Sequence, residues 1–240
     1  MREFVKTLQE DPDSLPEHER SSVGGPLQKL TDHPVVIGFA QEFLYQPYTS
    51  LGGPSVANED CYGFRQENSF ITVRSASGNR QGATGDGSFL PHNGNGMMRL
   101  PGDCHYYQAF PGHAHSALTR VVWELNQVAT GDGGTLLLTG SHKAAFPAPQ
   151  AVFSPESDLW DTYSCPEGSV LIFTEALTHS GIPWQSRTGE RVAVFNGYNS
   201  IHSKWHNWNP PDAVLNAMPE KRQSLYRPVY VSGNWIENNK

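Results

Sequence analysis

Residues 165–198 constrain the fold more than any other part of the chain, because they contain two short apolar runs separated by a polar turn. Residues 169–173 (SVLIF) follow the turn signal Pro-Glu-Gly, and residues 191–195 (RVAVF) are rich in strand-forming side chains. The pattern predicts a strand, a turn and a second strand. Alternate residues of a strand share a face, so Arg191 should point the same way as Phe195.

Two polar residues stand at the edges of these predicted strands. His179 follows the first apolar run, and Arg191 opens the second. A guanidinium on an interior face is costly unless an anion meets it. A neutral imidazole beside such a group suits a metal ion that holds an acidic co-substrate. The stretch therefore indicates a metal and anion site inside a β-structure, although one histidine among ten needs support from the rest of the chain.

Composition limits the classes of protein that fit. The chain has 240 residues, of which 37% are hydrophobic, 23 are glycine and 18 are proline. Frequent turns favour one β-rich domain, spanning residues 1–240, over a helical bundle. A net charge of −7 without a basic cluster argues against nucleic-acid binding, and no apolar run is long enough for a membrane span. Three widely spaced cysteines favour free thiols and a cytoplasmic location.

Local patterns predict the remaining elements. Residues 1–26 should be poorly structured or form a short helix, and residues 27–44 carry a helical pattern. A second short helix is predicted at residues 213–225, interrupted or started by Pro219. Further strands are predicted at residues 61–65, 69–73, 118–128 and 135–138. The last two should pair as a hairpin across a glycine-rich turn.

Several blocks occur in a fixed order along the chain: residues 123–128 (WELNQV), 138–143 (LTGSHK) and 166–173 (PEGSVLIF), followed by His179-Ser-Gly and Arg191. Together they resemble the phytanoyl-CoA dioxygenase-like family, over residues 28–205. The resemblance implies a mainly β, double-stranded β-helix (jelly-roll, cupin-like) fold with a few flanking N-terminal and C-terminal helices. It also implies an enzyme that uses Fe(II), 2-oxoglutarate and O2 to oxidise an aliphatic C–H bond of a small molecule.

The resemblance gives roles to individual positions. His179 resembles the distal iron ligand, and Arg191 resembles the arginine that binds the far carboxylate of 2-oxoglutarate through its planar fork. Arg187 is the rival, but it lies in the preceding turn and a surface position is expected. Trp123 and Ser180 resemble residues that flank the co-substrate, and Trp123 is equally consistent with plain core packing.

The sequence departs from the family in its other iron ligands. The family completes a triad of two histidines and one carboxylate with an H-x-D motif, and neither H-x-D nor H-x-E occurs here. His92 is the best positional equivalent of the second histidine, with His105 and the pair His113 and His115 as alternatives. Gly94 then stands where the family has its carboxylate.

Three outcomes stay open if His92 binds iron. Chloride can fill the position beside Gly94, as the resemblance to H-x-G halogenases implies, so that the substrate is halogenated instead of hydroxylated. Alternatively a carboxylate arrives from elsewhere, with Asp103 and Glu175 as candidates by location. In the third case water fills the position, and the protein is a weak or non-catalytic metal binder.

The alternative to an oxygenase is a non-catalytic, cupin-like binder of small molecules that has lost the full iron triad. The interior charge of Arg191 argues against this alternative, because it has no purpose without a diacid. In either case we expect a monomer or a homodimer.

Overall fold

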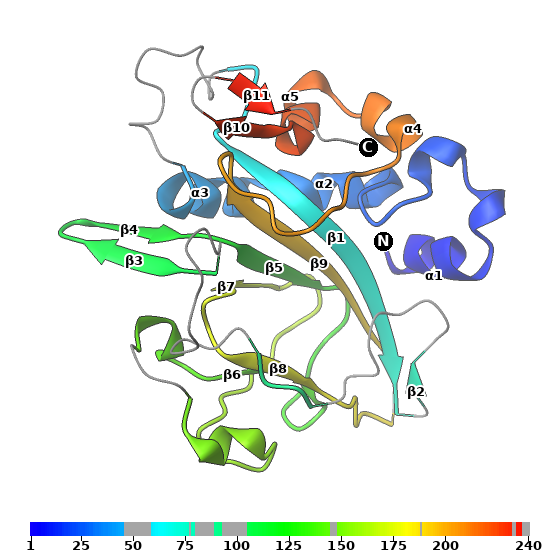
Figure 1. Ribbon diagram of the computed structural model, residues 1–240. Coiled ribbons are helices and arrows are strands. Elements are labelled where there is room, and N and C mark those ends of the chain that lie inside the picture. The colour runs from blue at the N-terminus through cyan, green and yellow to red at the C-terminus, as the bar shows by residue number, and fades with distance from the viewer. Residues whose placement is uncertain are drawn as a thin grey trace.

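A large antiparallel sheet is the main element of the fold, and a small two-stranded sheet lies across from it (Figure 1). The structure is a computed structural model that describes residues 1–45, 59–76, 78–79, 89–92, 105–144, 148–187, 189–231 and 234–236. The large sheet has the strand order β2-β1-β9-β5-β7. Its strands are β1 (Phe64–Ser75), β2 (Gly78–Asn79), β5 (Thr119–Glu124), β7 (Val170–Thr174) and β9 (Arg191–Ser200). The small sheet pairs β6 (Gly134–Leu137) with β8 (His179–Ile182).

Helices and two separate hairpins surround these sheets in the described residues. The hairpins pair β3 (Tyr107–Phe110) with β4 (His113–Ser116), and β10 (Val229–Val231) with β11 (Asn234–Ile236). The α-helices are α1 (Arg2–Glu10), α2 (Gln28–Thr31), α3 (Pro34–Phe43), α4 (Asp212–Asn216) and α5 (Glu220–Gln223). Short 3-10 turns span Pro12–Ser14, Glu17–Glu19, Gly25–Leu27, Ser141–Lys143, Gln150–Phe153 and Ser224–Tyr226.

Strand alternation divides the large sheet into a face covered by helices and a face that looks toward the small sheet. On β5, Val121 and Trp123 belong to the hydrophobic cluster that includes residues of α1, α2, α3 and α4. Val122 lies between them in sequence and belongs to a second cluster with residues of β7 and β9. Arg191 lies on this inner face with its guanidinium 5.7 Å from the centre of the Phe195 ring, as the period of two predicts.

The predicted hairpin between residues 118–128 and 135–138 is wrong. β5 pairs with β7 and β9 in the large sheet, whereas β6 pairs with β8 in the small one. Gly133 and Gly134 have φ values of 100° and 111°, a conformation that glycine adopts readily. The glycine-rich turn therefore carries the chain from one sheet to the other instead of folding it back on itself.

Three other predicted boundaries differ from the structure. One continuous strand, β1 (Phe64–Ser75), replaces the two strands predicted at residues 61–65 and 69–73, and its register shift between Gln66 and Asn68 shows that the predicted gap is a bulge within a strand. The N-terminal segment is more ordered than predicted, because α1 and three 3-10 turns anchor it and Val5 is buried in the main core. The predicted C-terminal helix begins one residue earlier, at Asp212, and it is interrupted at Pro219 as expected.

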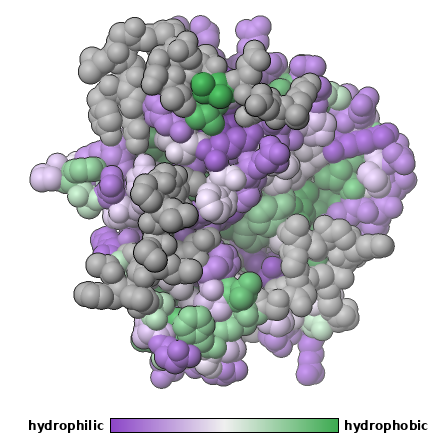
Figure 2. Space-filling model, in the orientation of Figure 1, coloured by the Kyte–Doolittle hydropathy of each residue, from purple (hydrophilic) through white to green (hydrophobic). Residues whose placement is uncertain are grey.

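The surface and the thiols agree with the expectations from composition. Figure 2 shows a mainly hydrophilic surface in this view, with hydrophobic residues gathered in a recess to the right of the centre. Within the described residues, Cys61 and Cys165 form no disulfide. Across the described ranges, none of the helices combines the length and the apolar character that a membrane span needs.

We expect opposite effects on stability from adding one methyl group at Gly197 and at Gly38. A Cβ at Gly197, which is buried in β9, would lie 2.1 Å from Asn68 Oδ1, and Asn68 is held in place by Arg120. Gly197→Ala should therefore lower the free energy of unfolding by about 1–3 kcal/mol, as overpacking does.

Gly38 lies on the exposed side of α3, and a Cβ there meets no atom within 4 Å. Gly38→Ala should raise the free energy of unfolding by about 0.5–1 kcal/mol, because alanine loses less backbone entropy in a helix. Urea denaturation of both variants measures the difference. An increase in stability for Gly197→Ala would contradict the close approach of β1 and β9.

Candidate metal centre

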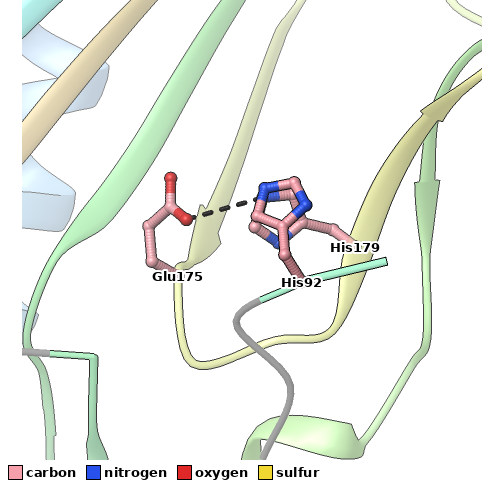
Figure 3. Close-up of side chains that lie close together, drawn as sticks. All are labelled: His92, Glu175 and His179. Atoms are coloured by element: carbon pink, nitrogen blue, oxygen red, sulfur yellow. Dashed lines mark ion pairs between the residues drawn. The ribbon is translucent and has the colours of Figure 1, made fainter. Parts of the chain in front are cut away.

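The turn between β7 and β8 brings two polar residues to the inside of the fold. Glu175 follows the last residue of β7, and His179 is the first residue of β8. The Glu175 backbone N–H donates to Leu118 O at 2.8 Å, and the Thr178 N–H donates to the Ser141 hydroxyl at 2.7 Å. These bonds fix both ends of the turn, and Figure 3 shows the Glu175 carboxylate directed toward the imidazole rings.

His92 reaches the same place from a distant part of the sequence. Its backbone pairs with that of His179 in an antiparallel bridge, with N–H to carbonyl distances of 3.1 Å and 3.3 Å. The Leu90 N–H also donates to the Ser180 hydroxyl at 2.9 Å. The two imidazole rings consequently lie side by side, with their centres 4.2 Å apart. The structure thus brings together the two histidines that the sequence analysis selected first.

Hydrogen bonds determine which ring nitrogen of each histidine can bind a metal. His92 Nδ1 lies 2.7 Å from Leu90 O, and His179 Nδ1 lies 2.8 Å from Leu177 O. A carbonyl oxygen can only accept, so each Nδ1 carries the proton and each Nε2 keeps a lone pair. Ring N–H groups held by backbone carbonyls are typical of metal-binding histidines.

Glu175 supplies a carboxylate to this pair of imidazoles. Its Oε2 lies 3.5 Å from His179 Nε2, and ligand atoms of Glu175, His92 and His179 all lie within 4.8 Å of one another. Two imidazole nitrogens and one carboxylate oxygen form the donor set of the non-heme iron facial triad. The residues present therefore fit an Fe(II) ion, with Glu175 as the carboxylate that the sequence lacks after His92.

Arg120 keeps the Glu175 carboxylate ionised. Burial alone would raise the pKa of Glu175, but the positive charge of Arg120 and the neighbouring imidazoles outweigh it and lower this pKa to about 2. Arg120 Nε donates to Glu175 Oε1 at 2.7 Å, and Arg120 Nη1 donates to Asn68 Oδ1 at 2.9 Å. The guanidinium thus holds one carboxylate oxygen and orients the other toward the histidines.

The His179 side chain is neutral at physiological pH. Burial lowers its pKa to about 4, against the opposing effect of the Glu175 charge. A metal ion does not have to displace a proton from such an imidazole, so binding at neutral pH carries no protonation cost at this position.

Arg191 lines the same cavity as His92, Glu175 and His179, but it already has an anionic partner. Its Nε lies 3.2 Å from Glu124 Oε2, and its Nη2 lies 2.5 Å from Glu124 Oε1. Nη1 is buried and has no hydrogen-bond partner within the part of the chain that the structure describes. Among the described residues, Nη1 is therefore the nitrogen of Arg191 whose hydrogen-bonding capacity is unused.

The other predicted site residues fall into different places. Trp123 lies on the helix-covered face of the sheet, with its ring centre 5.0 Å from that of His33, so it packs in the core and does not reach the cavity. Ser180 is buried and lines the cavity, where it anchors the segment of His92. Arg187 is exposed, as expected from its turn. Gly94 and Asp103 lie outside the described residues.

The alternative histidines are not part of the cluster of possible ligands. His105 lines the cavity, but its ring packs edge-on against Trp205 at 4.6 Å. His113 and His115 belong to β4, and their rings contact each other at 4.4 Å. Neither of these two residues lines the cavity.

The cavity has a volume of about 470 Å³ and continues from the metal-binding groups to an aromatic rim. Phe70 and Phe195 stack in its wall with ring centres 4.8 Å apart, and Trp205 is 57% exposed at its edge. His206 also lines the cavity, and its Nδ1 lies 2.6 Å from the fully buried carboxylate of Glu67. The cavity is thus large enough for a co-substrate and part of a small organic molecule.

Comparison with known proteins identifies the fold. No family model and no curated protein matches this chain. HygX from Streptomyces hygroscopicus with iron bound matches with a TM-score of 0.58 and 17% identity, over 86% of this chain and 81% of that chain. HygX with nickel, 2-oxoglutarate and hygromycin B bound matches with a TM-score of 0.56 and 17% identity, over 77% and 69%. The apo non-heme monooxygenase ThoJ matches with a TM-score of 0.50 and 14% identity, over 83% and 67%.

These identities are low, so the likeness concerns the fold. The predicted fold class is confirmed: the chain is mainly β, with the cupin-like architecture of non-heme iron, 2-oxoglutarate-dependent enzymes. Membership of the phytanoyl-CoA dioxygenase family stays a prediction.

Two charged residues at the site were not predicted from the sequence: Arg120, which lines the cavity, and Glu124, which pairs with the cavity residue Arg191. Arg120 and Glu124 lie on β5, where they alternate with the core residues Val121 and Trp123. The alternation of side chains along the strand could have revealed them. If Val121 and Trp123 lie on the face covered by helices, Arg120 and Glu124 must lie on the opposite face. Two charges on the inner face of a buried strand indicate partners there, and these are Glu175 and Arg191.

Replacing a member of the cluster should weaken metal binding. We expect His92→Ala and Glu175→Gln each to lower the affinity for Ni(II), used as a redox-inert substitute for Fe(II), by more than about 10–100-fold. A loss of about 10–100-fold is typical when the replaced residue only hydrogen-bonds to a metal ligand, so replacing a ligand itself should cost more. Isothermal titration calorimetry on the purified variants measures the change.

His142→Ala is the matched control, since His142 packs against Tyr107 with ring centres 4.8 Å apart and lies outside the cluster. Its affinity for Ni(II) should equal that of the wild type. Equal affinity for Glu175→Gln and the wild type would show that the carboxylate is not a ligand.

Proposed function

We propose that this chain is an Fe(II)- and 2-oxoglutarate-dependent oxygenase that acts on a C–H bond of a small molecule. One observation carries the proposal: ligand atoms of His92, Glu175 and His179 all lie within 4.8 Å of one another, and each Nδ1 contacts a backbone carbonyl oxygen, which leaves Nε2 as the nitrogen available to a metal. The likeness in fold to HygX, which has been solved with nickel, 2-oxoglutarate and hygromycin B bound, supports it.

Each residue of the site has a physical task in this proposal. His92, Glu175 and His179 hold Fe(II), and bound iron would supply the activation of O2 that is coupled to conversion of 2-oxoglutarate into succinate and CO2. Arg120 holds Glu175 as an ionised ligand through the 2.7 Å bond to Oε1. Arg191 receives the far carboxylate of 2-oxoglutarate on its open Nη1.

Hydroxylation is the outcome that the geometry favours over halogenation. The halogenation hypothesis depends on a vacant ligand position beside Gly94. In this proposal Glu175 supplies the carboxylate in place of the missing aspartate, which would leave no ligand position for chloride; the cluster of Glu175 with His92 and His179 supports it. Of the three outcomes that the sequence left open, the supply of a carboxylate from elsewhere is the one we adopt.

The substrate side of the cavity fits a small organic molecule. Phe70 and Phe195 offer an apolar wall, and Trp205 offers an exposed aromatic surface at the entrance. The buried Glu67 accepts from His206 Nδ1 and from the Trp205 backbone N–H, which holds both rim residues in place. Substrate recognition by this rim belongs to the proposal.

The alternative function, a non-catalytic binder, is less well supported than an oxygenase. The reason differs from the one that the sequence suggested. Arg191 does not argue against it, since Glu124 already neutralises the buried guanidinium. The argument against it is the triad itself. Two imidazoles with ordered tautomers and a buried carboxylate kept ionised by Arg120 are an expensive arrangement for a protein without a metal.

Adding Fe(II) and then 2-oxoglutarate without oxygen should produce a visible charge-transfer absorption band. On admission of oxygen, the protein should form succinate at the same rate with and without chloride, because no ligand position is left for a halide. Absorption spectroscopy and succinate analysis measure the two effects. His179→Ala should lose both.

A protein that binds neither ligand, or binds them without an absorption band, would be a non-catalytic binder. Succinate formation that depends on chloride would favour the halogenase hypothesis and remove Glu175 from the ligand set.

A further inference from the structure

Glu124 and Arg191 form a buried ion pair, and Arg191 also lines the cavity. The Arg191 side chain has no exposed surface, and that of Glu124 is 1% exposed. The carboxylate meets the Nε and Nη2 edge of the guanidinium, at 3.2 Å and 2.5 Å, in a two-point contact. This is the geometry in which an arginine binds a carboxylate most strongly.

Neighbouring groups hold this pair in place. Tyr163 donates its hydroxyl hydrogen to Glu124 Oε1 at 2.5 Å and accepts from Arg191 Nη2 at 2.9 Å. The Thr135 hydroxyl lies 3.4 Å from the same Nη2. Tyr163 is itself positioned by its chain neighbour Asp161, whose backbone bridges to Leu137 of β6. Glu124 therefore cannot leave Arg191 without breaking several buried hydrogen bonds.

A carboxylate that enters the cavity can bind only the part of the Arg191 guanidinium that Glu124 does not already occupy. Nε and Nη2 are occupied, and Nη1 is the donor without a partner in the described part of the chain. The incoming group can thus make an end-on contact but not a bidentate one. Its charge also meets an arginine that is already neutralised, so the electrostatic gain is reduced.

We infer that Glu124 is a specificity-determining residue for the co-substrate, because it limits how strongly Arg191 distinguishes a terminal carboxylate from an uncharged end. This inference rests on the proposed function. The cavity should accept 2-oxo acids as a class, with only a modest preference for 2-oxoglutarate over 2-oxovalerate. The two probes share the metal-chelating 2-oxo acid group, and they differ in that 2-oxovalerate ends in a methyl group.

The experiment compares the two acids by isothermal titration calorimetry on the Ni(II)-loaded protein. The wild type should bind 2-oxoglutarate no more than about tenfold tighter than 2-oxovalerate, as expected for one hydrogen bond to a neutralised partner. Glu124→Gln frees the charge of Arg191 while keeping an acceptor beside it. This variant should bind 2-oxoglutarate about tenfold tighter than the wild type and 2-oxovalerate equally well.

Glu190→Gln is the matched control, because it removes one negative charge from the adjacent position in the chain, on a side chain that borders a different cavity with Arg2 and Val192. It should leave both affinities unchanged. A loss of structure in Glu124→Gln would alter the affinity for both acids together, so the change in their ratio reports on the charge of Arg191 alone.

The outcomes separate this inference from the proposed function. If neither acid binds the Ni(II)-loaded wild type, the proposed function fails and the inference fails with it. If both bind but Glu124→Gln leaves their ratio unchanged, the inference alone is overturned.

The wild type also tests the inference without any variant. A preference for 2-oxoglutarate well above tenfold would overturn it and would point to Arg74. Arg74 is the cross-strand partner of Arg191 and the other cation at this end of the cavity.

Discussion

The ion pair between Arg120 and Glu175 is the interaction on which the proposed metal centre depends. A buried carboxylate without a cation would take up a proton and lose its value as a metal ligand. Arg120 prevents this by binding Oε1, and Asn68 and the Phe70 ring hold the guanidinium in turn. The large sheet supplies Arg120, and the turn after β7 supplies Glu175. Glu175 is thus held as an ionised metal ligand only in the folded protein, where the sheet and the turn lie together.

A second buried pair, Glu124 with Arg191, repeats this arrangement beside the same cavity, which Arg191 lines. In each pair the positive and negative charges match, so the two pairs add no net charge to the interior. A divalent cation and a dianionic co-substrate would also balance each other on entering. Binding of the co-substrate after the metal would therefore reduce the net charge that the metal brings into the cavity.

The sequence predicts the fold class and part of the site, because those features depend on local patterns. Alternation in residues 191–195 places Arg191 on the inner face, and the sequence predicts His179 after the first apolar run, although not the strand β8 that it opens. The same reasoning fails where pairing is decided by distant strands. β5 and β6 look like a hairpin in sequence but join different sheets. Glu175 could only be one candidate among others, since its approach to His92 depends on a bridge across 87 positions of sequence.

The most direct test of the metal centre is a crystal structure of the protein with Fe(II), with the ion located by anomalous scattering. We predict a single strong peak in coordination distance of His92 Nε2, His179 Nε2 and a Glu175 carboxylate oxygen. A peak that is bound by the two histidines but has chloride or water in place of Glu175, or a peak at other residues, would contradict the account.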